Sequence, residues 1–214
     1  MPAHIGAGLE PLSVDLVDSP VGRLLVGASA TAVHVLEFTD PDNEQARIEA
    51  ARKRFATPGP SRAAPAAPAA PAAPTAPTAS AAPAAPSAAN PRALDLLVRV
   101  RQQLNEYFAG QRKAFDLPLR YAGSPFQQRV WAGLLTIGYG ETLSYLDLAR
   151  RLGDEKSLRA VGQANGQNPI AIVIPCHRVI NASGDLGGFG GGPARKRFLL
   201  ELESREQRGQ LELL

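Results

Sequence analysis

The sequence has one cysteine, one methionine and one tryptophan among 214 residues, and aromatic residues make up only 6% of it. A single cysteine excludes an internal disulfide and a cysteine-rich zinc site, and it is typical of a protein from a reducing compartment. No apolar run reaches the length that a membrane-spanning helix needs. Residues 1–20 lack the basic and apolar segments of a secretory signal peptide. We therefore expect a cytoplasmic protein, nucleoid-associated in a bacterium, with no membrane partner.

Residues 57–91 are mainly alanine and proline, and they have almost no large or charged side chains. Arg62 is their single charged residue. Proline recurs at every third position from Pro65 to Pro77, which favours an extended polyproline-like segment. The composition predicts a disordered linker. The alternative is a site for a proline-reading partner, but alanine offers such a partner little to grip.

A β-meander is predicted for residues 12–38, where apolar and polar side chains alternate and turn residues occur near positions 19 and 29. A helix is predicted for residues 92–110, with Gly110 as its C-terminal cap. Apolar residues at helical spacing on this segment are Leu94, Leu97, Leu104 and Phe108. The meander and the helix predict a small α+β domain over residues 1–116, interrupted by the linker.

The second half of the chain, residues 117–214, carries the whole of the formal net charge of +3, which permits a polyanionic partner without requiring one. A helix is expected to begin with Ser124 at the N-cap and Pro125 at the first helical position. Its expected core face consists of Phe126, Val130, Trp131, Leu134 and Leu135.

Two short helices follow, in residues 140–153 and 154–168. Ser144 with Asp147 three residues later resembles a capping box, and Gly153 is suited to ending the first helix. Two short helices joined by a tight turn indicate a helix-turn-helix, although many ordinary helix pairs share this pattern.

The second helix of this pair has small side chains where a helix that reads the major groove carries long polar ones. The small residues are Ala160, Gly162, Ala164 and Gly166. Small side chains would let the backbone approach the narrow minor groove of DNA, with Arg159 as the long exception. The alternative is that they allow tight packing on a neighbouring helix and that Arg159 is only solvated.

The single cysteine lies in "IPCHRVI", directly before His177. Residues 170–174 form an apolar run that predicts a buried strand, which Pro175 would stop, so that Cys176 sits at its end. A lone cysteine is more often a small buried apolar residue than a nucleophile. Neighbouring residues in a strand point to opposite faces, but a turn after Pro175 would let the thiol and the imidazole reach one site.

Five segments, in this order and spacing, resemble the O6-alkylguanine-DNA alkyltransferases, the methylated-DNA–protein-cysteine methyltransferases. They are "SPFQQRVW", "GETLSYLDLA", "LRAVGQANGQNP", "IPCHRVI" and "RKRFLLELE". The resemblance covers residues 115–206 well and the meander more loosely. It implies an α+β protein with a ribonuclease-H-like domain in 1–116 and a mainly helical helix-turn-helix domain in 117–214. It also implies a DNA repair protein that moves an alkyl group, once and irreversibly, from O6-alkylguanine to its own cysteine, with O4-alkylthymine as a further candidate lesion.

The resemblance implies Cys176 as the nucleophile, which passes its proton through a water molecule to His177, and Glu203 as the residue that orients the histidine. Glu201 is the competing carboxylate on the same expected helix, but the family spacing favours Glu203. Tyr145 matches the tyrosine that supplies a proton or hydrogen bond near N3 of the departing guanine. An ordinary thiol is a weak nucleophile at neutral pH, so the cysteine needs a base such as His177 to take its proton.

The family's substrate pocket maps onto five further positions of the sequence by the same motif match. Asn168 matches an asparagine that supports the active-site turns and the water network. The carbonyl of Val179, together with that of the cysteine, matches the acceptors for the guanine amino group. Phe189 and Gly190 lie in the loop that walls the alkyl pocket, where many members have tyrosine and some have serine. Arg159 matches the arginine that fills the gap left by a flipped base.

The expected partner is double-stranded DNA containing O6-alkylguanine, bound through the minor groove by the helix that holds Ala160 and Gly162. We expect a monomer with no cofactor and no metal. Arg178 is interpreted as mainly structural, and Arg195 and Lys196 either contact phosphates or are solvated.

Three other classes of protein remain as alternatives. A non-catalytic lesion-binding relative would lack the cysteine. A damage-sensing regulator with a zinc-bound cysteine-rich domain would need more cysteines than this chain has. A cysteine hydrolase would need an oxyanion framework, and nothing in the sequence resembles one.

The linker yields the first testable prediction. Because residues 60–89 offer no apolar surface to offset the entropy of ordering, we expect them to be dispensable. A deletion that joins the flanks through a short flexible spacer should keep the melting temperature and the rate of alkyl transfer. A large loss of either would contradict the linker interpretation.

Overall fold

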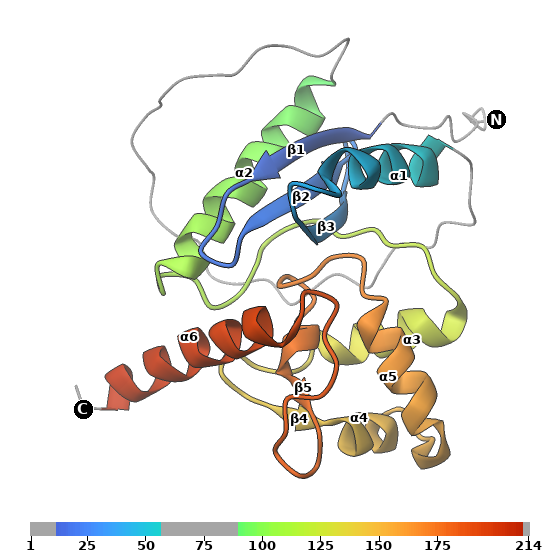
Figure 1. The fold of residues 1–214 in the computed structure, drawn as a ribbon, viewed down its shortest axis with the longest axis vertical. Helices are drawn as coiled ribbons and strands as arrows, with labels where there is room; N and C mark the ends of the chain where they lie inside the picture. Colours follow the sequence, from blue (N-terminus) through green and yellow to red (C-terminus); the bar gives the residue numbers. More distant parts are fainter. Residues whose placement is uncertain (1–11, 57–89, 212–214) are drawn as a thin grey trace, which may run out of the picture.

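The structure is a computed structural model that describes residues 12–56 and 90–211 (Figure 1). The predicted linker lies outside these ranges except for its last two residues. Asn90 caps the next helix by accepting a hydrogen bond from the backbone N–H of Arg92 at 3.0 Å, and Pro91 is the first residue of that helix. The linker therefore ends earlier than the sequence analysis placed it.

The predicted β-meander is confirmed as a three-stranded antiparallel sheet of β1 (Ser13–Val17), β2 (Arg23–Ala28) and β3 (Val33–Thr39) in the order β1-β2-β3. The register of β2 and β3 shifts after Gly27, which marks a β-bulge.

Two helices cover the sheet on opposite faces. Leu24 and Val26 of β2 pack into the main core with α2 (Pro91–Phe108), whereas Leu25 packs with Ala51 of α1 (Glu44–Ala56). This alternation follows the two-residue period of a strand. The sequence analysis did not predict α1.

Helix α2 is confirmed, and its C-terminal end is followed by Gly110 at a φ of 73°, the left-handed conformation that glycine adopts most readily. Leu97 and Leu104 are buried, but Leu94 is 45% exposed. The expectation of a core role for Leu94 was therefore wrong: the apolar stripe of the helix runs through Ala93 and Leu97 instead.

The second half contains α3 (Pro125–Leu134), α4 (Tyr145–Arg151), the 3-10 helix η1 (Glu155–Ser157), α5 (Leu158–Gly166) and α6 (Pro193–Leu211). The predicted caps are present. Ser124 and Gln127 form a reciprocal capping box, and the hydroxyl of Ser144 accepts from the backbone N–H of Asp147 at 3.0 Å. Helices α4 and α5 form the expected helix pair, and both pack on α3.

Residues 170–174 do not form the predicted strand. Only Ile170 pairs with β3, as an isolated bridge to Leu36, and the chain then turns back at Ile172, whose φ is 70°. The side chain of Asn168 stabilises this turn, because it accepts from the N–H of Ile170 at 3.0 Å and donates to the carbonyl of Ile174 at 2.7 Å. The apolar run correctly predicted that residues 170–174 are buried. Burial alone does not show whether a segment is a strand or a tight turn.

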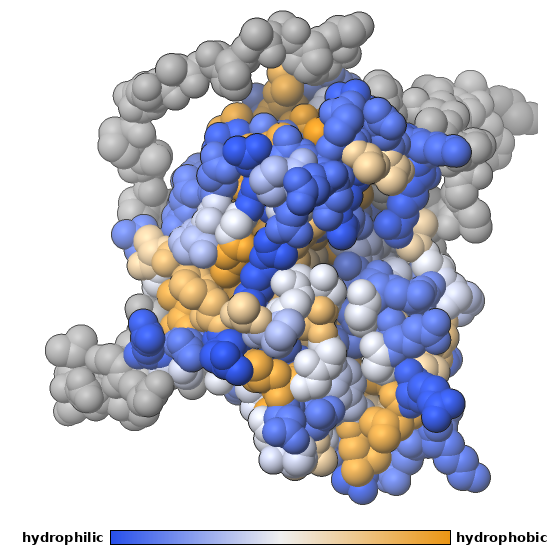
Figure 2. All heavy atoms as spheres, viewed as in Figure 1, coloured by the Kyte–Doolittle hydropathy of each residue, from blue (hydrophilic) through white to orange (hydrophobic). Residues whose placement is uncertain are grey.

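After this turn the chain enters the 3-10 helix η2 (Cys176–Arg178) and the short strand β5 (Val179–Ile180), which pairs in parallel with β4 (Leu143–Ser144). The sheet and the helical half share one continuous apolar core, to which β2, α2, α3 and the turn at 170–174 all contribute. Polar residues cover most of the face seen in Figure 2. Within the described residues, no helix combines the length and apolar character needed to cross a membrane.

Candidate active site

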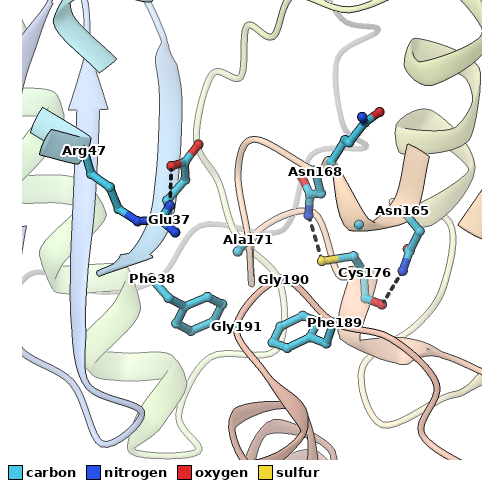
Figure 3. A pocket seen from close by; sticks show the side chains of 12 residues that line it. Glu37, Phe38, Arg47, Asn165, Asn168, Ala171, Cys176, Phe189, Gly190 and Gly191 are labelled. Atoms are coloured by element: carbon cyan, nitrogen blue, oxygen red, sulfur yellow. Dashed lines mark hydrogen bonds and ion pairs between the residues drawn. The ribbon is translucent and has the colours of Figure 1, made fainter. Parts of the chain in front are cut away.

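The thiol of Cys176 is 4% exposed and lies at the start of η2. Its Sγ accepts a hydrogen bond from Nδ2 of Asn168 at 3.0 Å (Figure 3). Burial raises the pKa of the thiol to about 11, against the opposing effects of this hydrogen bond and of the charge on Lys196. At neutral pH the resting thiol is therefore protonated, and it becomes a strong nucleophile only when a base takes its proton.

The adjacent imidazole of His177 is fully buried and suited to act as that base. Its Nε2 lies 2.9 Å from Oε1 of Glu203, and a carboxylate can only accept, so Nε2 carries the proton. Burial lowers the pKa of His177, although the carboxylate of Glu203 acts to raise it. The ring is therefore neutral at physiological pH. Nδ1 is then a buried acceptor, and it has no hydrogen-bond partner among the described residues. The histidine can accept one proton at this atom.

The carboxylate of Glu203 on α6 is fully buried and accepts hydrogen bonds on both oxygens. Oε1 accepts from the hydroxyl of Tyr107 at 2.7 Å and from His177, and Oε2 accepts from the N–H of Gly140 at 2.9 Å. Arg178 binds both oxygens, each at 2.9 Å. Burial opposes ionisation, but the hydrogen bonds from His177 and Arg178 hold the pKa at about 2.

Between the two carboxylates that the sequence offered, Glu203 and not Glu201 contacts the histidine. Glu201 is exposed and lies 3.7 Å from Arg205 on the same helix. Arg178 also donates to the carbonyl of Ile137 at 2.6 Å, so its guanidinium is satisfied within the fold. This burial agrees with the structural role expected for Arg178.

The phenol of Tyr145 at the start of α4 donates to the carbonyl of Gly188 at 3.1 Å. Burial raises its pKa, so the hydroxyl is protonated and remains a donor at neutral pH. Sequence reasoning missed its neighbour Asn165, which is 1% exposed and donates to the carbonyl of Cys176 at 3.3 Å and, at 3.5 Å, to the oxygen of Tyr145. The available signal was an amide side chain between the small residues Ala164 and Gly166 of α5.

The sequence suggested that Lys196 is solvated or contacts phosphates. In the structure it is neither solvated nor placed to contact phosphates. It is fully buried, and its Nζ donates to the carbonyls of Val179 at 2.6 Å, Gly188 at 3.4 Å and Leu186. Burial lowers its pKa to about 8. Its carbonyl partners come from the loop that follows β5 and from β5 itself, so the ammonium fixes that loop from inside.

Arg195 was assigned to the same two alternatives, and its contacts also lie within the protein. It bonds to the carbonyl of Val21 at 2.7 Å and to the carboxylate of Asp40 at 2.6 Å. Both partners belong to the N-terminal half of the chain.

The thiol opens into a cavity of about 320 Å³ between the two halves of the molecule (Figure 3). Both halves supply its wall, which consists of Glu37, Phe38, Arg47, Asn165, Gly166, Gln167, Asn168, Ala171, Cys176, Phe189, Gly190 and Gly191. A second, more open hollow of about 580 Å³ shares Gly166, Phe189 and Gly190 with the first and is also bordered by Tyr145 and Gly162. Phe189 and Gly190 therefore border both the thiol's cavity and a hollow beside α5.

The outer face of α5 is open. Arg159 and Ala160 are exposed, and a Cβ added to Gly162 or Gly166 would meet no atom within 4 Å. Packing on a neighbouring helix therefore does not require glycine at either position. Ala164 differs, because it is buried and its carbonyl accepts from the indole of Trp131 at 2.8 Å. The packing explanation holds for Ala164 but not for the two glycines.

The structure thus brings Cys176, His177 and Glu203 together, with Asn168 and Tyr145 beside the thiol and the carbonyl of Val179 held by Lys196. Arg159 and Ala160 lie apart from this group, on the exposed side of α5. Among the described residues no cluster of three histidine, cysteine or carboxylate side chains could hold a metal ion.

Comparison with known proteins identifies the class. Residues 13–121 match the family described as 6-O-methylguanine DNA methyltransferase, ribonuclease-like domain, and residues 125–205 match its DNA binding domain. The methylated-DNA–protein-cysteine methyltransferase of Mycobacterium bovis is 59% identical over 111 residues, which cover 52% of this chain and 67% of that protein. The constitutive enzyme of Bacillus subtilis is 52% identical over 108 residues, or 50% and 66% of the two chains.

Solved structures agree with this assignment over nearly the whole length. The O6-methylguanine methyltransferase of Mycobacterium tuberculosis has a TM-score of 0.65 and 38% identity, and the match covers 91% of this chain and 94% of that one. A structure of the same protein in complex with DNA has a TM-score of 0.63, with coverage of 90% and 93%. The chain belongs to the family of methylated-DNA–protein-cysteine methyltransferases.

The buried ion pair yields a prediction that separates the two glutamates of α6. Replacing Glu203 by glutamine leaves Arg178 buried without its counter-charge, so the free energy of unfolding near neutral pH should fall by about 3 kcal/mol. The pKa of Glu203 is lower in the folded chain than its usual 4.5, so ionisation stabilises the fold above that pH and this contribution is lost as the pH falls toward 2. The deficit of Glu203→Gln should therefore shrink on acidification.

Denaturant unfolding near neutral pH and at about pH 3 measures this deficit. Glu201→Gln, on the exposed side of the same helix, is the matched control and should change stability little at either pH. Equal losses for the two variants, or a deficit that does not depend on pH, would contradict the assignment of the buried charge to Glu203.

Proposed function

We propose that this protein repairs DNA by transferring an alkyl group, typically methyl, from O6 of guanine to the sulfur of Cys176, once per molecule. The observation that carries the proposal is a buried thiol at a cavity, beside a neutral histidine whose one free nitrogen can accept a proton. Membership of the methyltransferase family supports the choice of substrate, because its named relatives act on methylated DNA.

The first step is removal of the thiol proton. The proton moves from Sγ of Cys176 through one bridging water molecule to Nδ1 of His177, and Glu203 stabilises the imidazolium that forms. Because Glu203 stays ionised down to about pH 2, it can compensate this charge at any physiological pH. Asn168, which already donates to Sγ, stabilises the thiolate.

The second step is an in-line displacement at the alkyl carbon. A carbon–sulfur bond forms, the carbon–oxygen bond breaks, and its electron pair stays on the guanine. The hydroxyl of Tyr145 turns from the carbonyl of Gly188 to N3 of the leaving base and transfers its proton there, and the proton held by His177 can restore the phenol through solvent.

The guanine amino group donates to the carbonyls of Cys176 and Val179. The carbonyl of Val179 already accepts from Lys196, and that of Cys176 accepts from the N–H of Val179 and, at 3.3 Å, from Asn165. The guanine amino group would therefore replace the long bond from Asn165.

The target base must leave the helical stack to reach a buried thiol. We assign contact with the minor groove to the exposed face of α5, where Gly162 and Gly166 leave room for the sugar-phosphate walls and Ala160 adds little bulk. Arg159 fills the space vacated by the flipped base. The hollow lined by Tyr145, Phe189 and Gly190 is the entrance toward the thiol.

The remaining assignments follow the same family pattern. Residues 1–116 form the ribonuclease-like domain and residues 117–214 the domain that accepts the alkyl group, and the protein acts as a monomer on double-stranded DNA. Phe189 and Gly190 wall the alkyl pocket without the hydroxyl groups that some relatives have there.

Stoichiometry provides the decisive test. A thioether has no leaving group activated enough for water to displace, and the sequence has no second cysteine to take the alkyl group onward. Mixing the protein with a duplex containing O6-methylguanine should give a burst equal to the protein added and a mass gain of about 14 Da on the peptide with Cys176, the thiolate being the acceptor. Cys176→Ala should bind the duplex and remove nothing. Sustained turnover, or repair by Cys176→Ala, would refute the proposal.

Base flipping predicts different outcomes for two substitutions. Arg159→Ala should slow repair of duplex DNA by more than about tenfold but reaction with free O6-benzylguanine by less than about twofold, because only the duplex pays the cost of unstacking. Tyr145→Phe should slow both reactions, because both release guanine. Single-turnover rates on the two substrates give the comparison. If Arg159→Ala slowed both reactions equally, Arg159 would not fill the space left by the flipped base.

A further inference from the structure

A ring from the N-terminal half supports the wall of the thiol's cavity. Phe38 near the end of β3 and Phe189 in the loop before α6 meet edge to face, with ring centroids 5.5 Å apart and an interplanar angle of 66° (Figure 3). Phe38 is buried and Phe189 is partly exposed. The position of Phe189 thus depends on a residue more than a hundred positions earlier in the chain.

Arg195 in the first turn of α6 holds this contact from the side. Its Nε donates to the carbonyl of Val21 at 2.7 Å, one terminal nitrogen donates to Asp40 at 2.6 Å, and the other reaches the carbonyl of Gly191 at 3.3 Å. The guanidinium carbon lies 5.2 Å from the centroid of Phe38. One side chain therefore joins the turn after β1, the end of β3 and the cavity loop.

The fit between these parts is close. A Cβ on Gly191 would lie 2.6 Å from the ring of Phe38, and a Cβ on Gly22 would lie 3.1 Å from Arg195. Gly22 also has a φ of 94°, a conformation that favours glycine. Neither ring nor guanidinium has space to shift toward these backbones.

The loop has a separate anchor at its other end, where Lys196 binds the carbonyls of Leu186 and Gly188. Between the two anchors, Phe189 has no polar atom in its side chain, so ring packing alone sets where the ring lies. Its carbonyl accepts one local bond, from the N–H of Gly192 at 3.0 Å. The edge-to-face contact with Phe38 is a direct interaction that holds the ring against the cavity.

We propose that Phe38 and Arg195 are positioning residues that latch residues 189–192 to the N-terminal half and thereby set the preference of the cavity for bulky alkyl groups. This inference rests on the proposed function. A methyl group is too small to gain much from a fixed aromatic wall. A benzyl group can stack on Phe189, and its reaction rate depends on how well that ring is held in place.

The test uses the full chain and two duplexes of identical sequence, one with O6-methylguanine and one with O6-benzylguanine. Phe38→Leu keeps an apolar side chain without the ring, and Arg195→Lys keeps the charge without the planar fork that spans three partners. Because an ordered aromatic contact is worth severalfold in rate, we expect the benzyl-to-methyl rate ratio to fall by about fivefold in each variant, with the methyl rate within about twofold of the original.

Two control variants match the substitutions. Val35→Ala removes a buried side chain of β3 that packs on the α1 side of the sheet, and Arg205→Lys alters an exposed arginine that pairs with a carboxylate on α6. Neither should change the rate ratio. Hydrogen–deuterium exchange of the peptide over residues 186–195 is the second measurement, and the latch variants should exchange faster there while the controls do not.

The proposal requires both results. An unchanged rate ratio, an unchanged exchange rate, or an equal effect in the controls would overturn it. If Phe38→Leu fails to fold, Arg195→Lys carries the test alone. If the original protein transferred no alkyl group, the proposed function would fail, and the exchange measurement would still decide whether these two residues hold the loop.

Discussion

The site depends on the hydrogen bonds and the ion pair that the buried carboxylate of Glu203 makes. This carboxylate bonds to Tyr107 from the N-terminal half, to the backbone before β4, and to both His177 and Arg178 of η2. These segments are distant in sequence, and a single fully buried charge brings them to one point. A buried charge without partners would be very costly, so each partner is required by the fold as well as by the chemistry.

This arrangement determines the resting state of the reactive pair. Burial raises the pKa of Cys176 and lowers that of His177, so both groups are neutral before substrate arrives. A protonated, buried thiol reacts slowly with oxidants and stray electrophiles, because the thiolate is the reactive form. That protection has a clear value in a protein whose only thiol is consumed by one reaction. In the proposed mechanism, the thiol becomes reactive when an electrophile occupies the cavity and its proton moves to Nδ1 of His177 during the attack.

Local signals in the sequence predicted the elements that local interactions stabilise. The hydroxyls of Ser124 and Ser144 cap α3 and α4 as expected, and the alternating pattern of residues 12–38 gave the sheet. Helix α1 was missed because its polar, strongly charged sequence has only a weak apolar stripe. The strand expected at 170–174 became a turn because the side chain of Asn168 satisfies backbone groups that a sheet would otherwise bond.

The errors on charged residues have a different origin. Lys196 lies between two arginines in the sequence, a context typical of a solvated helix face. It is buried because three backbone carbonyls converge on its ammonium, and carbonyl positions set by tertiary structure leave no local pattern. The family spacing favoured Glu203 over Glu201, and Glu203 is the carboxylate that contacts His177. Residue type and period alone could not separate two glutamates two positions apart.

The two halves of the chain contribute in different ways. Every group to which we assign a part in the reaction comes from residues 145–203, whereas the N-terminal half supplies a phenol that bonds to Glu203 and a ring that packs on Phe189. The bridge between Leu36 and Ile170 places the edge of the sheet directly against the turn that precedes the cysteine. A thiol held at the end of a tight turn can be aimed only if that turn cannot move. The sheet therefore acts on the chemistry through rigidity, by closing the back of the cavity and fixing the backbone from which the nucleophile projects.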